Sequence, residues 1–200
     1  MITNRRSEQN RETAETNIQV KMNIDGSGIY HIDTGNGMFD HLLTHLSKHS
    51  LIDLTVKAKG DTEIGWHHLV EDTGIVIGKA MKECVGDGAG INRMGYAYAP
   101  LDEALARTVV DFSGRGYSVL QLMLGDTDMG DLPADLVRHF LESFAREAGC
   151  NLNVEVLSGL NNHHKAEAAF KSMAKAIKNA VSIDDRQEGK IPSTKGTISD

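Results

Sequence analysis

One motif occurs twice in the sequence and most constrains the fold. His67-His68-Leu69-Val70-Glu71 recurs 96 residues later as His163-His164-Lys165-Ala166-Glu167. Each copy follows a predicted strand and a glycine, and each opens a long helical pattern. A third histidine also precedes each copy, His41 by 26 residues and His139 by 24. Because the order of elements, the histidine pairs and the carboxylates repeat together, the sequence predicts an internal duplication.

The duplication predicts two copies of one α/β unit. Alternating apolar residues and glycine-rich turns favour a βββαα unit at approximately residues 15–90 and again at 100–182, within one domain of 1–200. We expect an α+β fold, a two-layer α/β sandwich with one helix layer on a mixed sheet. Residues 18–24 and 29–32 are predicted to pair as a hairpin. Asp40 is predicted to cap a helix over 41–49, and residues 192–196 to form a mobile loop.

Charge and cysteine content limit the partners and the location. The chain has 21 Lys and Arg against 28 Asp and Glu, a net charge of -7, which disfavours nucleic acid. Its longest near-continuous apolar run, Val119 to Leu124, is far too short to cross a bilayer, so no membrane partner is expected. Two cysteines without a CxxC spacing and an N-terminus without an apolar core indicate a cytoplasmic protein with reduced thiols.

The repeated motif has the spacing of metal ligands. Residues four apart share a helix face, so the first histidine of each pair lies beside the glutamate. Imidazole and carboxylate together suit a borderline divalent ion such as zinc, iron or manganese. Adjacent residues diverge by about 100°, so the second histidine of each pair should serve a different ion. The pattern predicts two pseudo-symmetric metal sites, completed by His41 and His139. A single histidine pair is more often structural, but duplication favours metal binding.

Other polar residues carry weaker signals. His31, His45 and His49 have no partner in the repeat, and we assign them no ligand role. Asp102-Glu103 suits a catalytic role and a capping or salt-bridge role equally well. Cations beside glycine or serine turns are candidate phosphate contacts, although each one taken singly is more often structural. These cations are Arg93, Arg115, Lys171 and Lys195.

Taken in order, these motifs resemble the imidazoleglycerol-phosphate dehydratase family, from about Arg11 to Gly196. The matching segments are Arg11-x-Thr13-x-Glu15-Thr16, Asp25-Gly26-x-Gly28, Thr34-Gly35, Phe39-Asp40-His41-Leu42-Leu43, Gly60-Asp61, His67-His68-x-x-Glu71-Asp72, Gly90-Ile91-x-Arg93-x-Gly95, Pro100-Leu101-Asp102-Glu103-Ala104-Leu105, Ser113-Gly114-Arg115, Asn162-His163-His164-x-x-Glu167-Ala168-x-Phe170-Lys171 and Pro192-Ser193-Thr194-Lys195-Gly196.

The resemblance implies a hydro-lyase of L-histidine biosynthesis with a ribosomal protein S5 domain 2-like fold. Such an enzyme converts D-erythro-imidazole-glycerol phosphate to imidazole-acetol phosphate and water. The resemblance also implies two Mn²⁺ ions per subunit and a homo-oligomer of 24 subunits with active sites between subunits. The implied metal ligands are His41, His67, His68, Glu71, His139, His163, His164 and Glu167. The implied substrate contacts are Glu15, Arg93, Arg115, Lys171, Ser193 and Lys195.

Two departures from the family pattern stand near these ligands. Ile64-Gly65-Trp66 replaces the Ile-Asp-Asp or similar sequence that many members carry before the first histidine pair. His45 stands where a glutamine commonly follows the Asp-His-Met-Leu motif. Both changes leave the ligands in place, so they bear on the orientation of the metal-binding histidines and on one polar substrate contact.

The implied reaction removes a proton from a carbon that has no neighbouring carbonyl, so enolate chemistry is not open to it. We expect two metal ions to hold both imidazole nitrogens and stabilise an imidazolate, which expels the hydroxyl as water and gives a diazafulvene-like intermediate. Glu15 or Glu167 then acts as the catalytic base, and the sequence does not choose between them.

Two alternatives use the same residues differently. A diverged dinuclear metallohydrolase would activate water against phosphoesters with a similar ligand set. A non-catalytic metal-binding or RNA-binding module would share the fold. The acidic charge disfavours RNA, and passive metal storage would not need the arginine and lysine set.

Overall fold

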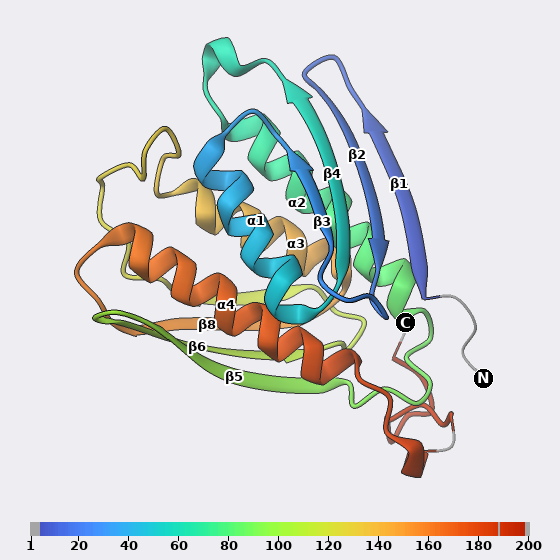
Figure 1. The fold of residues 1–200 in the computed structure, drawn as a ribbon. Helices are drawn as coiled ribbons and strands as arrows, with labels where there is room; N and C mark the ends of the chain where they lie inside the picture. Colours follow the sequence, from blue (N-terminus) through green and yellow to red (C-terminus); the bar gives the residue numbers. More distant parts are fainter. Residues whose placement is uncertain (1–4, 188, 199–200) are drawn as a thin grey trace.

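The chain folds into two similar halves, shown in the computed structural model of Figure 1, which describes residues 5–187 and 189–198. The first half contains β1 (Arg6–Glu12), β2 (Thr16–Asn23), β3 (Tyr30–Asp33), α1 (Gly37–Ser50), β4 (Asp53–Gly60), the short helix η1 (Thr62–Ile64) and α2 (His67–Val85). The second half contains β5 (Met94–Leu101), β6 (Ala104–Asp111), β7 (Tyr117–Gln121), α3 (Leu136–Ala148), β8 (Asn151–Ser158), α4 (Asn162–Val181) and the short helix η2 (Asp185–Gln187).

Both halves have the same sheet topology. The strand orders are β1-β2-β4-β3 and β5-β6-β8-β7. In each sheet the last pair, β3 with β4 and β7 with β8, is parallel and the other pairs are antiparallel. The expected α+β class and the duplication are confirmed. The order of each unit is βββαβα instead of βββαα, because β4 and β8 stand between the two helices of their halves, and the halves begin at Arg6 and Met94.

The expected hairpin of residues 18–24 and 29–32 is wrong, because β4 lies between β2 and β3. The segment after β2 crosses the start of β4 instead of turning back. The Asp53 carboxylate of β4 accepts hydrogen bonds from the backbone N–H groups of Ser27 and Ile29, at 2.8 and 3.0 Å. A side chain at Gly26 would collide with Asp53, its Cβ only 2.4 Å from Cγ, so this close crossing requires glycine.

The four helices lie between the two sheets (Figure 1). Each half is therefore a two-layer α/β sandwich, and the two helix layers face one another, with α1 against α4 and α2 against α3. The α2–α3 crossing is close, because Gly74 and Gly78 face the backbone carbonyls of Phe140 and Phe144. A methyl group at either glycine would come within 2.8 Å of a carbonyl oxygen. The ends of α2 and α3 are thereby fixed relative to one another.

Two local predictions need correction. The N-cap of α1 is Asn36, whose side chain accepts from the Phe39 N–H at 2.9 Å. Asp40 lies within the first turn and accepts hydrogen bonds from Thr34 instead. The segment after Pro192 is docked, not loose, because Arg93 Nη1 donates to the Pro192 carbonyl at 3.0 Å and Ile198 is buried in the core.

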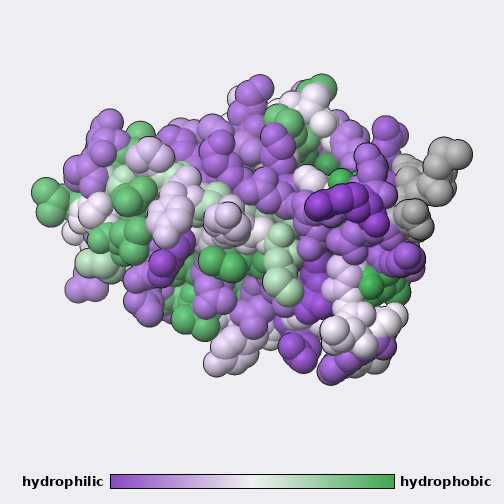
Figure 2. Space-filling model, turned by 90° about the horizontal axis from the view of Figure 1, so that it is seen from below, coloured by the Kyte–Doolittle hydropathy of each residue, from purple (hydrophilic) through white to green (hydrophobic). Residues whose placement is uncertain are grey.

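The outer face of the second sheet carries a mixture of apolar and polar side chains. Figure 2 views the molecule from below, where apolar patches alternate with hydrophilic ones. Exposed aromatic residues of this sheet include Tyr96, Tyr98 and Tyr117. Within the described residues, no helix combines the length and apolar character required to cross a membrane.

Candidate metal centre and catalytic site

A first group of donor atoms lies where α1 meets α4. His41 of α1 and His163 of α4 both approach one oxygen of Glu167, with Nε2–Oε2 distances of 2.9 and 3.1 Å. One donor atom from each of the three residues lies within 4.8 Å of the others. We call these three residues the α1–α4 group. His163 and Glu167 are one turn apart on α4, as the spacing predicts, and His41 comes from the facing helix.

The other oxygen of Glu167 has its own partners. Lys171 Nζ lies 2.5 Å and His45 Nε2 3.2 Å from Oε1. Burial opposes ionisation of Glu167, whose side chain is only 9% exposed. Hydrogen bonds from Lys171 and His41 outweigh that effect and lower its pKa to about 2. Burial lowers the pKa of His45 to about 4, so this imidazole is neutral at pH 7. The carboxylate is therefore ionised and tightly held.

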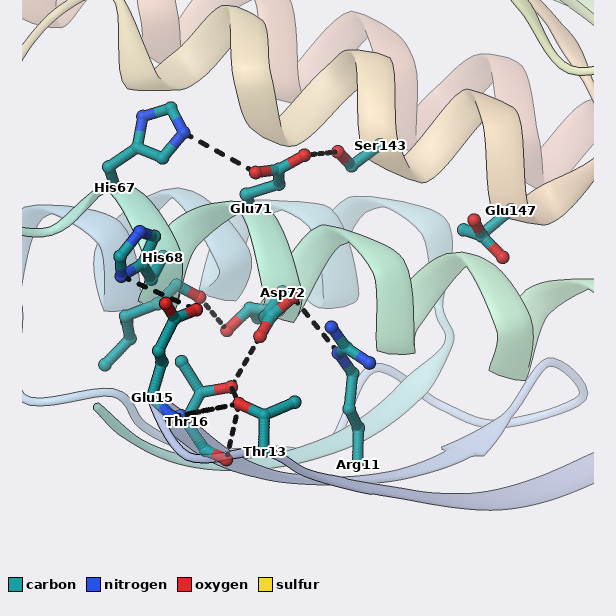
Figure 3. Close-up of polar contacts among 12 residues, drawn as sticks. Arg11, Thr13, Glu15, Thr16, His67, His68, Glu71, Asp72, Ser143 and Glu147 are labelled. Carbon is teal, nitrogen blue, oxygen red and sulfur yellow. Dashed lines mark hydrogen bonds and ion pairs between the residues drawn. The ribbon is translucent and has the colours of Figure 1, made fainter. Parts of the chain in front are cut away.

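A second group lies where α2 meets α3. His67 Nε2 is 3.5 Å from Glu71 Oε2, and the His139 ring of α3 has its centroid 4.6 Å from that of His67. Figure 3 shows His67 and Glu71 on the α2 face that is turned toward α3. We call His67, Glu71 and His139 the α2–α3 group. It is more open than the first, since the Glu71 side chain is 36% exposed.

The second histidine of each pair points elsewhere. His68 Nδ1 lies 3.1 Å from an Asp61 oxygen and 3.8 Å from Glu15 Oε2. His164 Nδ1 lies 2.7 Å from Glu103 Oε2. A hydrogen bond from Nδ1 to a carboxylate leaves Nε2 with its lone pair free for a ligand. These bonds raise the pKa of both histidines. The predicted divergence of adjacent histidines is thus the observed geometry.

Glu15 lies beside His68 in the turn between β1 and β2 (Figure 3). The Thr13 hydroxyl accepts from the Glu15 N–H at 3.1 Å, and Thr16 donates to the buried Asp72 of α2. Arg11 Nε donates to the same carboxylate at 3.0 Å. The backbone of this turn is therefore tied to α2, whereas the Glu15 carboxylate is half exposed.

The pseudo-symmetric counterpart of Glu15 is Glu103, which likewise directly precedes the second strand of its half. The Glu103 carboxylate accepts from the N–H groups of Leu160 and Asn161 and from His164. These hydrogen bonds lower the pKa of Glu103 to about 2, and the bond from the Asn161 N–H has the largest effect. The sequence left a catalytic role and a capping or salt-bridge role open for Asp102-Glu103. In the structure Glu103 makes capping and salt-bridge contacts.

The donor chemistry of both groups fits a divalent transition metal. Each combines imidazole nitrogens with one carboxylate, drawn from two facing helices, and neither is a cysteine site. Both cysteines are buried, and burial raises the pKa of each thiol to about 12, so neither is a ready nucleophile.

Comparison with known proteins decides the family. A family model described as imidazoleglycerol-phosphate dehydratase matches residues 34–177. The chain belongs to this family. It is therefore a hydro-lyase, an imidazoleglycerol-phosphate dehydratase of histidine biosynthesis.

Curated dehydratases match over nearly their whole length. The chain is 48% identical to the enzyme of Zymomonas mobilis, over 94% of this chain and 96% of that protein. It is 47% identical to the enzyme of Methanothermobacter thermautotrophicus, over 99% and 100%. Among solved structures, the dehydratase of Staphylococcus aureus is 34% identical and superposes with a TM-score of 0.81, covering 90% of this chain and 99% of that one. The enzyme of Pyrococcus furiosus gives 32% and 0.80, covering 94% and 99%.

Most of the expected phosphate contacts of the dehydratase lie far from the metal groups. Arg93 N–H donates to the Ala180 carbonyl, 17 residues along α4 from His163, a distance of about 25 Å on a helix. The Arg93 guanidinium forms a bidentate salt bridge with Asp111 and donates a hydrogen bond to the carbonyl of Pro192, which precedes Ser193. Arg115 lies in the turn that contacts Gly149, at the opposite end of α3 from His139. Ser193 and Lys195 follow on the docked C-terminal segment.

Three of the predicted polar residues therefore lie at the same end of the helices as the metal groups, and the others do not. Glu15, Glu167 and Lys171 lie at the ligand end, whereas Arg93, Arg115, Ser193 and Lys195 lie at the far end of the helices. Two residues near the expected ligands were assigned no ligand or catalytic role from the sequence. Asp61, at the end of β4, orients His68, and His45 reaches Glu167.

Proposed function

We propose that this dehydratase converts D-erythro-imidazole-glycerol phosphate to imidazole-acetol phosphate with two Mn²⁺ ions per subunit. The observation that carries the proposal is the pair of imidazole–carboxylate groups, one in each facing helix pair, with a free-nitrogen histidine beside each. Residues that would hold the ions are His41, His67, His68, Glu71, His139, His163, His164 and Glu167. Bound there, the ions would act as Lewis acids on the substrate imidazole and favour its imidazolate form.

We assign the base to Glu15. Glu167 is engaged by His41, His163, His45 and Lys171, so no face of its carboxylate is left for a substrate proton. Glu15 is half exposed, sits on an anchored turn and lies next to a histidine of the ligand set. Loss of the hydroxyl from an imidazolate gives a diazafulvene-like intermediate. Glu15 then takes the proton of the neighbouring hydroxyl-bearing carbon, and the enol so formed becomes the ketone.

Assembly is part of the proposal. The substrate phosphate is only a few bonds from the imidazole, whereas the metal groups and the basic residues of one chain are about 25 Å apart. The metal end of one subunit and the basic end of another can meet only in an oligomer, and the 24-subunit assembly supplies such contacts. Phosphate binding by Arg93, Arg115, Ser193 and Lys195 would then hold the diol against the ligands. We place the enzyme in the cytoplasm, where its two free, buried cysteines are stable.

The test is turnover by metal-stripped protein before and after addition of Mn²⁺, Zn²⁺ or Mg²⁺. We expect imidazole-acetol phosphate only after reconstitution, with Mn²⁺ the most effective ion and two ions bound per chain. The same preparations are assayed with p-nitrophenyl phosphate. Phosphate release from that ester, without formation of the ketone, would favour the metallohydrolase instead.

A further inference from the structure

We infer that His45 is a positioning residue for Glu167 and that Ser143 is its counterpart for Glu71, so that the two metal sites are unequally preorganised. This inference rests on the proposed function, because it assumes that the α1–α4 and α2–α3 groups each bind an ion. Neither His45 nor Ser143 belongs to the ligand set. Each, however, lies one helical turn after a ligand histidine, His41 or His139.

The contacts of Glu167 divide by oxygen atom. His41 and His163 both approach Oε2, whereas His45 and Lys171 both approach Oε1. A hydrogen-bond donor on Oε1 fixes the rotation of the carboxylate and leaves Oε2 facing the ligand histidines. His45 also lies 3.3 Å from His41 through their Nε2 atoms, so it adjoins the group from the same helix face.

The α2–α3 group repeats this arrangement with other residues. Ser143 Oγ donates to Glu71 Oε1 at 3.5 Å, while His67 faces Oε2 (Figure 3). Arg146 lies 3.8 Å from the same Oε1, where Lys171 stands in the first group. A serine hydroxyl is a good hydrogen-bond donor and a poor ligand for these ions. The shared property of positions 45 and 143 is therefore a polar group beside the outer carboxylate oxygen, at 3.2 Å for His45 Nε2 and 3.5 Å for Ser143 Oγ, and not coordination.

The two arrangements differ in tightness. Glu167 is 9% exposed and its Oε1 contacts are 2.5 and 3.2 Å, whereas Glu71 is 36% exposed with contacts of 3.5 and 3.8 Å. A carboxylate that is already fixed loses less freedom on binding an ion. The α1–α4 site should therefore bind its ion more tightly than the α2–α3 site.

The experiment measures Mn²⁺ binding directly, by following the electron paramagnetic resonance signal of free Mn²⁺ during titration of the metal-stripped full chain. We expect two affinity classes in the wild type. In H45A the tighter class should weaken by about 10- to 100-fold, the usual cost of losing such a partner, while the weaker class stays unchanged. In H45Q, whose amide keeps a donor, it should stay within about threefold of the wild type.

Two further variants act as controls. His49 stacks on the His45 ring one turn further along α1, with centroids 5.4 Å apart, so its removal tests the loss of an imidazole beside His45. H49A should leave both affinity classes unchanged. S143A should weaken only the weaker class, and by less than H45A affects the tighter one, because its contact is longer. If H45A does not fold, H45L replaces it as a donor-free side chain of closer volume.

The outcomes separate this inference from the proposed function. Wild-type protein that binds no Mn²⁺ overturns both. Two bound ions with equal affinity, or affinities that H45A leaves unchanged, overturn the inference alone. H45Q as defective as H45A also overturns it, because the imidazole itself would then be a ligand.

Discussion

At the scale of single residues, the carboxylates of the site differ because their surroundings differ. Glu167 is buried and shared by four nitrogen groups, which hold it ionised with a pKa of about 2. Glu103 is fixed by backbone amides and His164. Glu15 alone of these three combines an exposed carboxylate with an anchored backbone. In the proposed function, the same functional group would thus bind metal at Glu167, orient a histidine at Glu103 and move a proton at Glu15.

The Glu15→Gln variant tests this division. We expect kcat to fall by about 10²- to 10⁴-fold, the usual contribution of a positioned general base, with both Mn²⁺ ions retained. Glu167→Gln should instead lose one Mn²⁺, because its charge is removed from the α1–α4 group. Metal content by mass spectrometry and steady-state rates on the same samples distinguish the two defects. Full activity in Glu15→Gln would exclude it as the base.

The divergence of the adjacent histidines was predictable at this scale because it depends on helix geometry. The angle between adjacent residues separates His67 from His68, and the structure has that separation. The role of His45 was not predictable, since its partner Glu167 is 122 positions away and comes close only through the α1–α4 packing. Asp61 is likewise joined to His68 by a turn whose path is not visible in the sequence.

At the scale of elements, apolar alternation predicted the buried strands but not the edges or the pairing. Strand β1 lies at the edge of its sheet and reads Arg-Ser-Glu-Gln-Asn-Arg-Glu, with only Ser7 buried, so it has no hydrophobic pattern. The hairpin prediction failed because adjacent strands in the sequence usually pair, whereas here β4 enters between β2 and β3. Helix positions were closer to the prediction, since their apolar spacing spans many turns.

The close crossing of α2 and α3 predicts how a substitution at Gly74 would shift α3. In Gly74→Ala, the new methyl group would meet the Phe140 carbonyl, so α3 must move away from α2. The steric overlap destabilises the fold, whereas alanine has a higher helix propensity than glycine and offsets part of that cost. The free energy of unfolding should fall by about 1–2 kcal/mol in total. His139 lies on α3 and would move with it, so Mn²⁺ binding at the α2–α3 group should also weaken.

Thermal unfolding and Mn²⁺ titration measure the two effects of Gly74→Ala. Gly37→Ala is the matched control, because nothing lies within 4 Å of a Cβ at that position. Equal stability and equal metal binding in the two variants would contradict the proposed role of this crossing.

At the scale of the whole molecule, the two ends of the helices hold different parts of the proposed site. The ligands gather at the N-terminal ends of α2, α3 and α4, and Arg93 lies near the C-terminal end of α4. Neither composition nor spacing shows this separation, because it depends on where the C-terminal segment docks. In the proposed function, the two ends of one site would therefore come from different subunits.

Mixing two inactive variants tests a site shared between subunits. Glu15→Gln removes the base at the ligand end, and Lys195→Ala removes a cation at the other end. If each site takes one end from each of two subunits, dissociating and co-assembling equal amounts should restore about one quarter of the wild-type sites, as random pairing gives. Each variant alone, treated identically, is the control. No recovery in verified mixed oligomers would mean that both residues serve the same site from one chain.

The duplicated halves meet mainly through their helices, with loop contacts such as the hydrogen bond from Asn36 Nδ2 to the Asp131 carbonyl, and in the described residues no strand of one sheet pairs with a strand of the other. Each half thus touches its neighbour as one protomer of a dimer touches another, and both candidate metal groups lie across that boundary. The chain therefore has the form of a homodimer whose two protomers are joined in one polypeptide. Unlike the protomers of a true homodimer, the halves carry different residues at one corresponding position, His45 in the first and Ser143 in the second.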